Sequence, residues 1–250
     1  MIPLKTPEKI EAMRAAGRIS AKVLRKTGEL VRPGISTLEL DRFAENLIRL
    51  EGAQPAFKGY GGFAGSICAS INNQIVHGIP SAEVILQEGD IISIDTGAIL
   101  AGWYGDNAAT FAVGKIGAGA ARLLEVTERS LWAGIEAAQV GGYLGDIGYA
   151  VQRVAEAAGF GVVREYVGHG IGKAMHEDPV VPNYGRRKSG VRLKTGMVLA
   201  IEPMINAGNY QTRGPYADGW IVYTADDSLS AHFELTVALT PEGPDILTKE

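Results

Sequence analysis

Residues 89–95, GDIISID, decide the fold, because they join a tight turn to a buried strand that ends on a carboxylate. The pair Gly89 and Asp90 is typical of a turn, and the apolar run after it is typical of a strand. The same pattern returns at residues 196–202, GMVLAIE, which also end on a carboxylate. Each run therefore predicts a strand whose last residue, Asp95 or Glu202, places an acidic side chain beside an apolar core.

Helix-breaking glycines repeat with nearly the same spacing as these strands. The acidic ends at positions 95 and 202 are 107 positions apart, and Gly34 and Gly142 are 108 positions apart. Two unrelated features that agree within one position favour a duplicated half over a coincidence among common apolar residues. No linker rich in proline, glycine or serine separates the halves. We therefore expect a single domain over 1–250, with pseudo-symmetric halves of about 1–114 and 115–250.

Apolar residues at three- and four-residue steps predict two helices in each half. The first follows the start signal Thr6 and Pro7 and is broken around Pro33, and Thr37 is expected to cap the second. Further helices are expected at 123–138 and 147–158, and strands within 54–80 and at about 107–113.

The composition is that of an ordinary globular protein. The 250 residues carry 24 basic and 28 acidic side chains, which gives a net charge of −4, and 46% of the residues are hydrophobic. A slightly acidic chain is not typical of a nucleic-acid binder, and no apolar run reaches the roughly 18–20 residues of a membrane span. The N-terminus lacks the apolar stretch of a signal peptide, and Cys68 has no second cysteine to pair with. We expect a cytoplasmic protein with no membrane contact and no sequence-specific nucleic-acid partner.

Carboxylates in or beside apolar strands are the strongest chemical signal in the chain. They are Asp95, Asp106, Glu202 and Glu234. One such residue is ordinarily a turn or a cap, but ionised carboxylates are rarely buried without a partner, and lysine and arginine are scarce nearby in the sequence. If the four lie together, their repulsion requires cations, and two divalent metal ions would supply them. His169, in the glycine-rich run GHGIG, adds a nitrogen donor. Such a set suits Mn, Fe, Co or Zn and argues against a cysteine-rich structural zinc site.

These five residues, in this order, closely resemble the ligands of the type I methionine aminopeptidases, dinuclear metallohydrolases of the pita-bread fold. The supporting motifs are SICASIN at 66–72, VHGIP at 76–80, GD at 105–106, GHGIG at 168–172, HEDP at 176–179 and IEPM at 201–204. The resemblance covers essentially the whole chain. The short gap between Glu202 and Glu234 resembles type I, because type II enzymes carry a helical insertion there. The resemblance implies an α+β pita-bread fold, in which helices flank a curved antiparallel sheet with an internal pseudo-twofold repeat.

The resemblance also implies a role for each polar residue of the site. For the two divalent metal ions it implies Asp106 and Glu234 as bridges, Asp95 on one ion, and His169 and Glu202 on the other. A water made acidic by the cations would attack the first peptide bond, with Glu202 as the proton shuttle. His77 and His176 would flank the scissile bond, position the peptide and stabilise the oxyanion and the leaving group.

A pocket for the methionine side chain is the last feature that the resemblance implies. It aligns with Phe57, Tyr60, Phe63, Cys68, Met175 and Trp220. Sulfur–aromatic contacts suit a thioether, although the aromatic residues among them could instead belong to the core. The chain departs from the family pattern in three places, because Met175 replaces a common aromatic residue, Gly97 a hydroxyl side chain and Leu235 a histidine of some relatives. His232 matches no catalytic position, so support of the site and a surface position both stay open.

The implied function is co-translational removal of the N-terminal methionine from nascent proteins whose second residue is small. We expect a monomer that associates transiently with the ribosome. One alternative is an X-Pro peptidase of the same fold, which the absence of an additional N-terminal domain disfavours. The other is a module that binds peptides or proteins without catalysis, and the presence of all five ligands with His77 and His176 disfavours it. The sequence does not distinguish Co, Mn, Fe and Zn.

Overall fold

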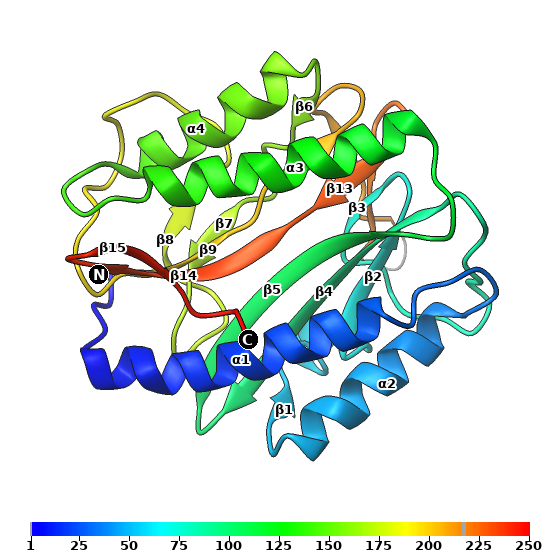
Figure 1. The fold of residues 1–250 in the computed structure, drawn as a ribbon, viewed down its shortest axis with the longest axis horizontal. Coiled ribbons are helices and arrows are strands. Elements are labelled where there is room, and N and C mark those ends of the chain that lie inside the picture. Colours follow the sequence, from blue (N-terminus) through cyan, green and yellow to red (C-terminus); the bar gives the residue numbers. More distant parts are fainter. Residues whose placement is uncertain (1, 217–218) are drawn as a thin grey trace.

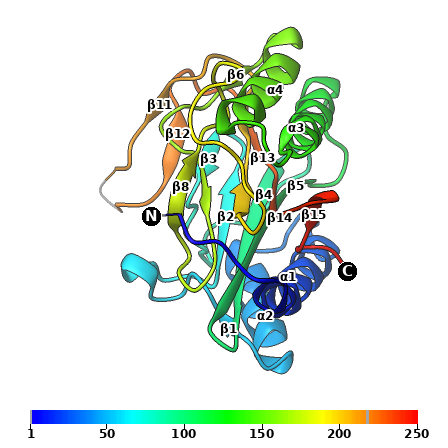
Figure 2. The same cartoon turned by 90° about the vertical axis from the view of Figure 1, so that its left-hand side faces the viewer.

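In the computed structural model, helices pack against one side of a curved antiparallel sheet (Figure 1). The structure describes residues 2–216 and 219–250. The described residues form four α-helices, α1 (Pro7–Gly28), α2 (Thr37–Leu50), α3 (Ala118–Ala137) and α4 (Leu144–Ala157). Figure 2 shows the pair α1 and α2 and the pair α3 and α4 on the same side of the sheet. No helix within the described ranges combines the length and the apolar character that a membrane crossing requires.

The largest sheet in the described part of the chain has nine strands, and every pairing in it is antiparallel. Its main path runs β1–β4–β5–β14–β9–β7–β8, while β2 also pairs with β4 and β15 with β14. The strands of this sheet are β1 (Gln54–Pro55), β2 (Ile67–Ile71), β4 (Ile91–Leu100), β5 (Trp103–Ala112), β7 (Gly168–Gly170), β8 (Glu177–Val181), β9 (Val198–Ile201), β14 (Glu234–Thr240) and β15 (Gly243–Ile246). Two smaller sheets contain β6 (Gly161–Val162), β10 (Met204–Asn206) and β13 (Ser230–His232), and β3 (Gln74–Val76), β11 (Thr212–Arg213) and β12 (Val222–Thr224).

The predicted elements are present, but several boundaries differ from the prediction. Helix α2 is capped by Ser36 and not by Thr37, so the predicted cap was wrong by one residue. The Ser36 hydroxyl accepts a hydrogen bond from Glu39 N at 3.2 Å, and the Glu39 carboxylate accepts one from Ser36 N at 2.9 Å. This reciprocal capping box satisfies two backbone donors at once, whereas a cap at Thr37 would leave the Ser36–Glu39 pair unused. Helices α3 and α4 begin earlier than predicted, at Ala118 and Leu144.

Helix α1 lies directly on the hairpin of β4 and β5, and this contact sets the position of the acidic strands. A Cβ atom on Gly105 would come within 2.5 Å of Gly17 N, so the backbones of helix and strand touch. The Ser20 hydroxyl oxygen lies 2.7 Å from both Thr96 O and Asn107 Oδ1. These contacts fix the residues that directly adjoin the two acidic positions of the hairpin.

Candidate metal centre and its pocket

Strand register places the predicted acidic residues on one face of the sheet. Asp95 pairs with Ala108 across β4 and β5, and Ala108 pairs with Glu234 across β5 and β14. Directly opposed residues in an antiparallel pair share a face, as do residues two apart on one strand. Asp106, two positions before Ala108, therefore points to the same side as Asp95 and Glu234.

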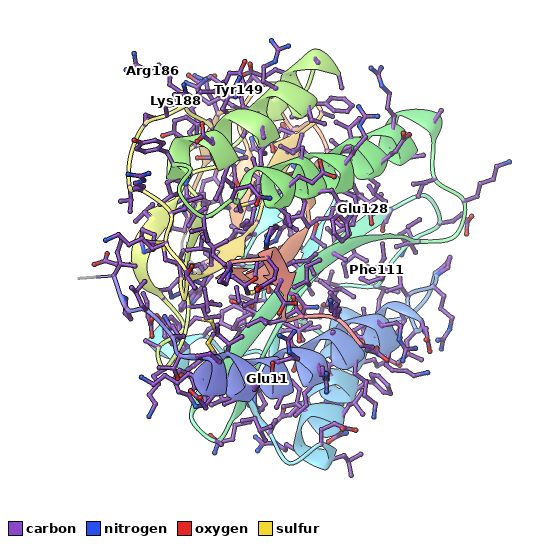
Figure 3. All side chains as sticks on the ribbon, turned by 60° about the vertical axis from the view of Figure 1, so that its left-hand side comes forward. Glu11, Phe111, Glu128, Tyr149, Arg186 and Lys188 are labelled. Atoms are coloured by element: carbon purple, nitrogen blue, oxygen red, sulfur yellow. The ribbon has the colours of Figure 1, made fainter. Side chains whose placement is uncertain are left out.

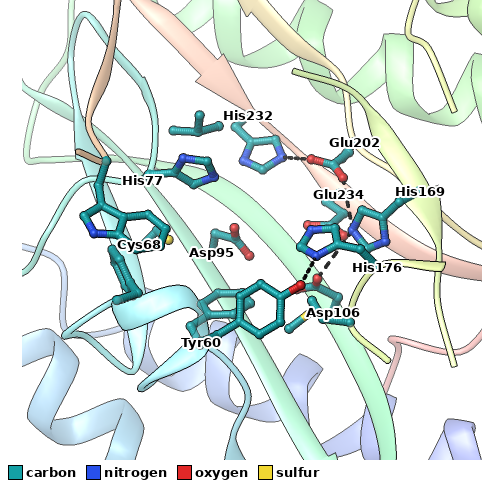
Figure 4. Close-up of a pocket in the computed structure, with 15 residues that line it drawn as sticks. Tyr60, Cys68, His77, Asp95, Asp106, His169, His176, Glu202, His232 and Glu234 are labelled. Atoms are coloured by element: carbon teal, nitrogen blue, oxygen red, sulfur yellow. Dashed lines mark hydrogen bonds and ion pairs between the residues drawn. The ribbon is translucent and has the colours of Figure 1, made fainter. Parts of the chain in front are cut away.

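The other two predicted ligands reach this face from the neighbouring strands. His169 on β7 pairs with Ala200 on β9, and Glu202 follows two residues after Ala200. His169 Nε2 lies 3.4 Å from Glu202 Oε1 and 3.9 Å from Asp106 Oδ2 (Figure 4). Residues that are far apart in the sequence are thus within ligand distance of one another.

The chemistry of this set fits divalent metal ions. Three buried carboxylate oxygens have no hydrogen-bond partner within the described ranges, namely Asp95 Oδ1, Asp106 Oδ1 and Glu234 Oε1. Two groups of residues offer ligand atoms that all lie within 4.8 Å of one another, Asp106–His169–Glu234 and Glu202–His232–Glu234. Asp95 belongs to neither group, although it lines the same pocket. Buried carboxylate oxygens without partners are costly, and cations are the ordinary solution to that cost.

The ring of His169 is oriented as a metal ligand would be. Its Nδ1 lies 2.9 Å from Gly170 O, and a carbonyl oxygen only accepts, so Nδ1 carries the hydrogen. The lone pair of Nε2 therefore points toward the carboxylates. Burial, with a contribution from His176, lowers the pKa of His169 to about 4, which keeps the imidazole neutral at physiological pH.

The carboxyl groups have strongly perturbed acidities. Burial raises the pKa of Asp106 to about 7. Burial, together with repulsion from the neighbouring carboxylates, raises the pKa values of Asp95, Glu202 and Glu234 well above their usual range. Without a cation the cluster therefore keeps protons at neutral pH, because ionising all of it would leave repelling charges in a buried site.

A cavity of about 210 Å³ adjoins the carboxylates. The residues predicted for the methionine pocket all line it, namely Phe57, Tyr60, Phe63, Cys68, Met175 and Trp220. Val76, for which no role was predicted, lines it too, and so does His232, which is therefore not at the surface. Burial raises the pKa of the Cys68 thiol well above its usual range, so this side chain is an apolar wall and not a nucleophile.

His77 and His176 both line the same cavity. The Tyr60 hydroxyl lies 2.8 Å from His176 Nδ1, which fixes the orientation of that ring. The His77 ring meets the Trp220 ring edge-on, with centroids 6.1 Å apart. Burial lowers the pKa of both histidines, so both rings are neutral near pH 7.

The three departures from the family pattern have structural explanations. Gly97 faces Asp106 across the hairpin, and a Cβ atom there would come within 3.0 Å of Phe57 Cε1 and 3.3 Å of Met175 Cε. The glycine therefore makes room for Ala56, whose Cβ would lie 2.8 Å away, as well as for Phe57 and Met175. Leu235 follows Glu234 on β14, so its side chain points to the opposite face of the sheet, where it packs against an apolar cluster.

Lys5 and Glu177, which were given no role from the sequence, hold the loop that carries Met175 and His176. Glu177 Oε1 accepts hydrogen bonds from Lys173 N at 2.9 Å and Ala174 N at 3.3 Å. Glu177 Oε2 accepts one from Lys5 Nζ at 2.5 Å, and the Lys5 side chain is only 4% exposed. Nothing in the sequence links positions 5 and 177, because tertiary packing alone brings them together.

Comparisons with known proteins agree with this geometry. The model of metallopeptidase family M24 matches residues 11–241. The methionine aminopeptidase of Clostridium acetobutylicum is 53% identical over 248 residues, which are 99% of each chain, and methionine aminopeptidase 1 of Bacillus subtilis is 53% identical over the whole of both chains. The crystal structure of the Rickettsia prowazekii methionine aminopeptidase covers the whole chain at 45% identity with a TM-score of 0.98. The Pyrococcus furiosus prolidase aligns over 65% of its own length at 25% identity with a TM-score of 0.78. These likenesses confirm the predicted pita-bread fold.

Replacing Lys5 by methionine is expected to lower the free energy of unfolding by about 3 kcal/mol, because the Glu177 carboxylate would lose its charged partner in a largely buried place. The amides of Lys173 and Ala174 are expected to exchange faster with solvent. Denaturant unfolding and hydrogen exchange measure both effects. The Lys9→Met variant is the matched control, since Lys9 is exposed beside the same segment. Equal stability of the two variants would contradict the anchoring role of Lys5.

Metal affinity is expected to rise with pH between about pH 5.5 and about pH 7.5. A cation must displace the protons held by the buried carboxyl groups, and the pKa of Asp106 is about 7. His169 does not compete there, because its pKa is about 4. Each displaced proton changes the affinity about tenfold per pH unit. Calorimetric titration with Co²⁺ in buffers of different ionisation enthalpy measures the affinity and the released protons, and an affinity that is independent of pH would contradict this expectation.

Proposed function

The chain belongs to metallopeptidase family M24, and from this premise we propose which of its residues carry the reaction. Its activity is the metal-assisted removal of an N-terminal methionine, as its relatives at 53% identity over whole chains indicate. The enzyme is thus a hydrolase that acts on polypeptide N-termini and uses divalent metal. The observation that best supports the assignment of residues is the cluster of buried, unpartnered carboxylate oxygens beside His169.

Two divalent ions are the number that the ligand set favours. In the proposed arrangement Asp106 and Glu234 would be shared by the two ions, Asp95 would hold one of them, and His169 and Glu202 would hold the other. The common sheet face of these residues supports this arrangement. The lone pair of His169 Nε2, directed at the carboxylates, supports it as well. Co, Mn, Fe and Zn all accept such donors.

Cations bound in this cluster would acidify a water molecule and polarise the carbonyl of the first peptide bond. Glu202 is the residue that we expect to take the proton of the attacking water and pass it to the leaving amine. Its carboxylate lines the cavity, with Oε1 facing His169. A carboxylate in that position lies beside the proposed metal ligands and at the cavity that would hold the scissile bond.

His77 and His176 are assigned to the scissile bond itself. Both are neutral, so each ring has one N–H group to donate. When the Tyr60 hydroxyl donates to His176 Nδ1, the hydrogen of that ring is on Nε2 and can be donated into the cavity. Donors that are already oriented in this way stabilise the oxyanion of a tetrahedral intermediate without reorganisation.

The apolar part of the cavity is assigned to the methionine side chain of the substrate. Its aromatic rings, the Cys68 thiol and Met175 provide polarisable contacts to a thioether. A preference for substrates whose second residue is small is part of the same proposal. Nascent polypeptides are the substrates in the cell. Action during translation by a cytoplasmic monomer, in transient contact with the ribosome, completes the proposal.

A three-peptide assay tests the specificity. Met-Ala-Ser is expected to release methionine, while Met-Leu-Ser and Leu-Ala-Ser should be cleaved with kcat/KM values lower by roughly 100-fold or more, because the second residue or the first no longer fits. Chelation of divalent metal should abolish all release, and added metal should restore it. Equal cleavage of Leu-Ala-Ser, or full activity after rigorous removal of metal, would refute the proposal. Cleavage of a Leu-Pro peptide alone would support an X-Pro peptidase.

Replacing Glu202 by glutamine tests the proton-transfer role. The amide keeps the size of the side chain but cannot accept the proton, so kcat is expected to fall by about 10²- to 10⁴-fold. Metal content must be measured in the same samples, so that loss of metal is distinguished from loss of proton transfer. The Glu128→Gln variant is the control, because Glu128 is an exposed residue of helix α3 (Figure 3). Near-normal turnover of the Glu202 variant with full metal content would remove this role.

A further inference from the structure

His232 lies inside the site, although neither the sequence motifs nor the proposed mechanism uses it. Its side chain is 2% exposed and lines the same cavity as the carboxylates. It is the last residue of β13, and Glu234 begins β14 two positions later. Figure 4 shows its ring directed at the Glu202 carboxylate.

The backbone of His232 is fixed by hydrogen bonds, which set the direction of its Cα–Cβ bond. His232 N donates to Thr110 Oγ1 at 2.9 Å, and Thr110 Oγ1 donates to His232 O at 2.9 Å. Across the other edge of β13, His232 pairs with Met204 of β10. Two neighbouring strands therefore set the point from which the side chain enters the cavity.

The distances around Glu202 are those of ligands that share an ion. His169 Nε2 lies 3.4 Å from Glu202 Oε1, and His232 Nε2 lies 3.6 Å from Glu202 Oε2. Two donor atoms bound about 2.1 Å from one ion, at angles between octahedral and trigonal, lie roughly 3.0–3.6 Å apart. The two imidazoles thus approach different oxygens of the same carboxylate, each at a distance too long for a hydrogen bond and suited to sharing an ion with that oxygen.

We propose that His232 is an additional metal ligand, whose Nε2 binds the ion that Glu202 and Glu234 hold. The inference rests on the proposed function, which supplies the metal site. It accounts for the group Glu202–His232–Glu234, whose ligand atoms lie within 4.8 Å of one another. It also accounts for His232 Nε2, a buried nitrogen without a hydrogen-bond partner among residues 2–216 and 219–250.

A role in packing alone explains these observations less well. A buried ring nitrogen without a partner carries a desolvation cost that an apolar side chain of similar size would avoid. The pairing of His232 with Thr110 involves only the backbone of His232, so it does not require an imidazole. The ring nitrogen is explained when a group in the cavity binds it, and the carboxylates nearest to it, Glu202 and Glu234, are both proposed ligands for a cation.

The proton NMR spectrum of the full-length protein loaded with Co²⁺ provides a test that needs no variant. A histidine bound through Nε2 gives a solvent-exchangeable Nδ1–H signal shifted far outside the normal range by the paramagnetic ion. Two such signals are expected, from His169 and His232. A single signal would overturn the proposal, even if the protein binds two ions and cleaves methionine peptides.

Variants make the assignment specific. His232→Ala is expected to lose one shifted signal and to weaken Co²⁺ binding by about 10- to 100-fold or more. Removing a residue that only orients a metal ligand already causes a loss of this size. Val76→Ala is the control for binding, because it shortens a side chain of the same cavity that is assigned neither to metal nor to catalysis. It should keep both signals and the affinity of the unchanged protein. Thermal unfolding of each metal-free variant shows whether it is folded.

Each outcome has a separate meaning. Unchanged affinity and two remaining signals in a folded His232→Ala variant would overturn the assignment and leave the proposed function intact. Failure of the unchanged protein to bind Co²⁺ at all would overturn the metal centre, and this inference with it. If His232→Ala does not fold, the number of shifted signals in the unchanged protein decides.

Discussion

Repulsion among four buried carboxylates is the constraint on which the site of this protein depends. The sheet places the acidic side chains of β4, β5 and β14 on one face, and the end of β9 adds the fourth. Burial raises the pKa of every one of them, and repulsion from neighbouring carboxylates raises the pKa values of Asp95, Glu202 and Glu234 further. A protein without a cation partner could keep such a cluster only by keeping it protonated. The fold therefore maintains a site that is unfavourable by itself and becomes favourable when cations bind.

The surrounding structure holds this cluster in place through its backbone. Glycine at position 105 lets helix α1 touch β5 beside Asp106, and Ser20 connects the same helix to both strands of the hairpin. At the far side, the buried pair of Lys5 and Glu177 holds the loop that brings His176 to the cavity. A site of this precision needs such anchoring, because ligand positions that vary by an ångström lose much of their affinity.

Much of the fold and most of the candidate site could be predicted from the sequence. Periodic apolar residues indicated the helices, and the runs at 91–94 and 198–201 indicated two of the strands, because local patterns reflect burial directly. The family resemblance then named five ligand residues and eight residues around them. All of these lie around one cavity. The boundaries were less accurate, as the cap at Ser36 shows, because the choice between adjacent hydroxyl residues depends on which one Glu39 can reach. The duplication of the two halves stays a prediction.

The sequence by itself determined which chemical groups are available, namely acidic residues at the ends of apolar runs and a histidine between glycines. Only the tertiary structure decided which of these groups meet. Strand register placed Asp95, Asp106 and Glu234 on one face, and a shift of one residue would have turned each strand's side chains away. The tertiary structure also brought His232 against Glu202 and Lys5 against Glu177. Such meetings depend on contacts between strands and segments that are distant in the sequence, and no local pattern records them.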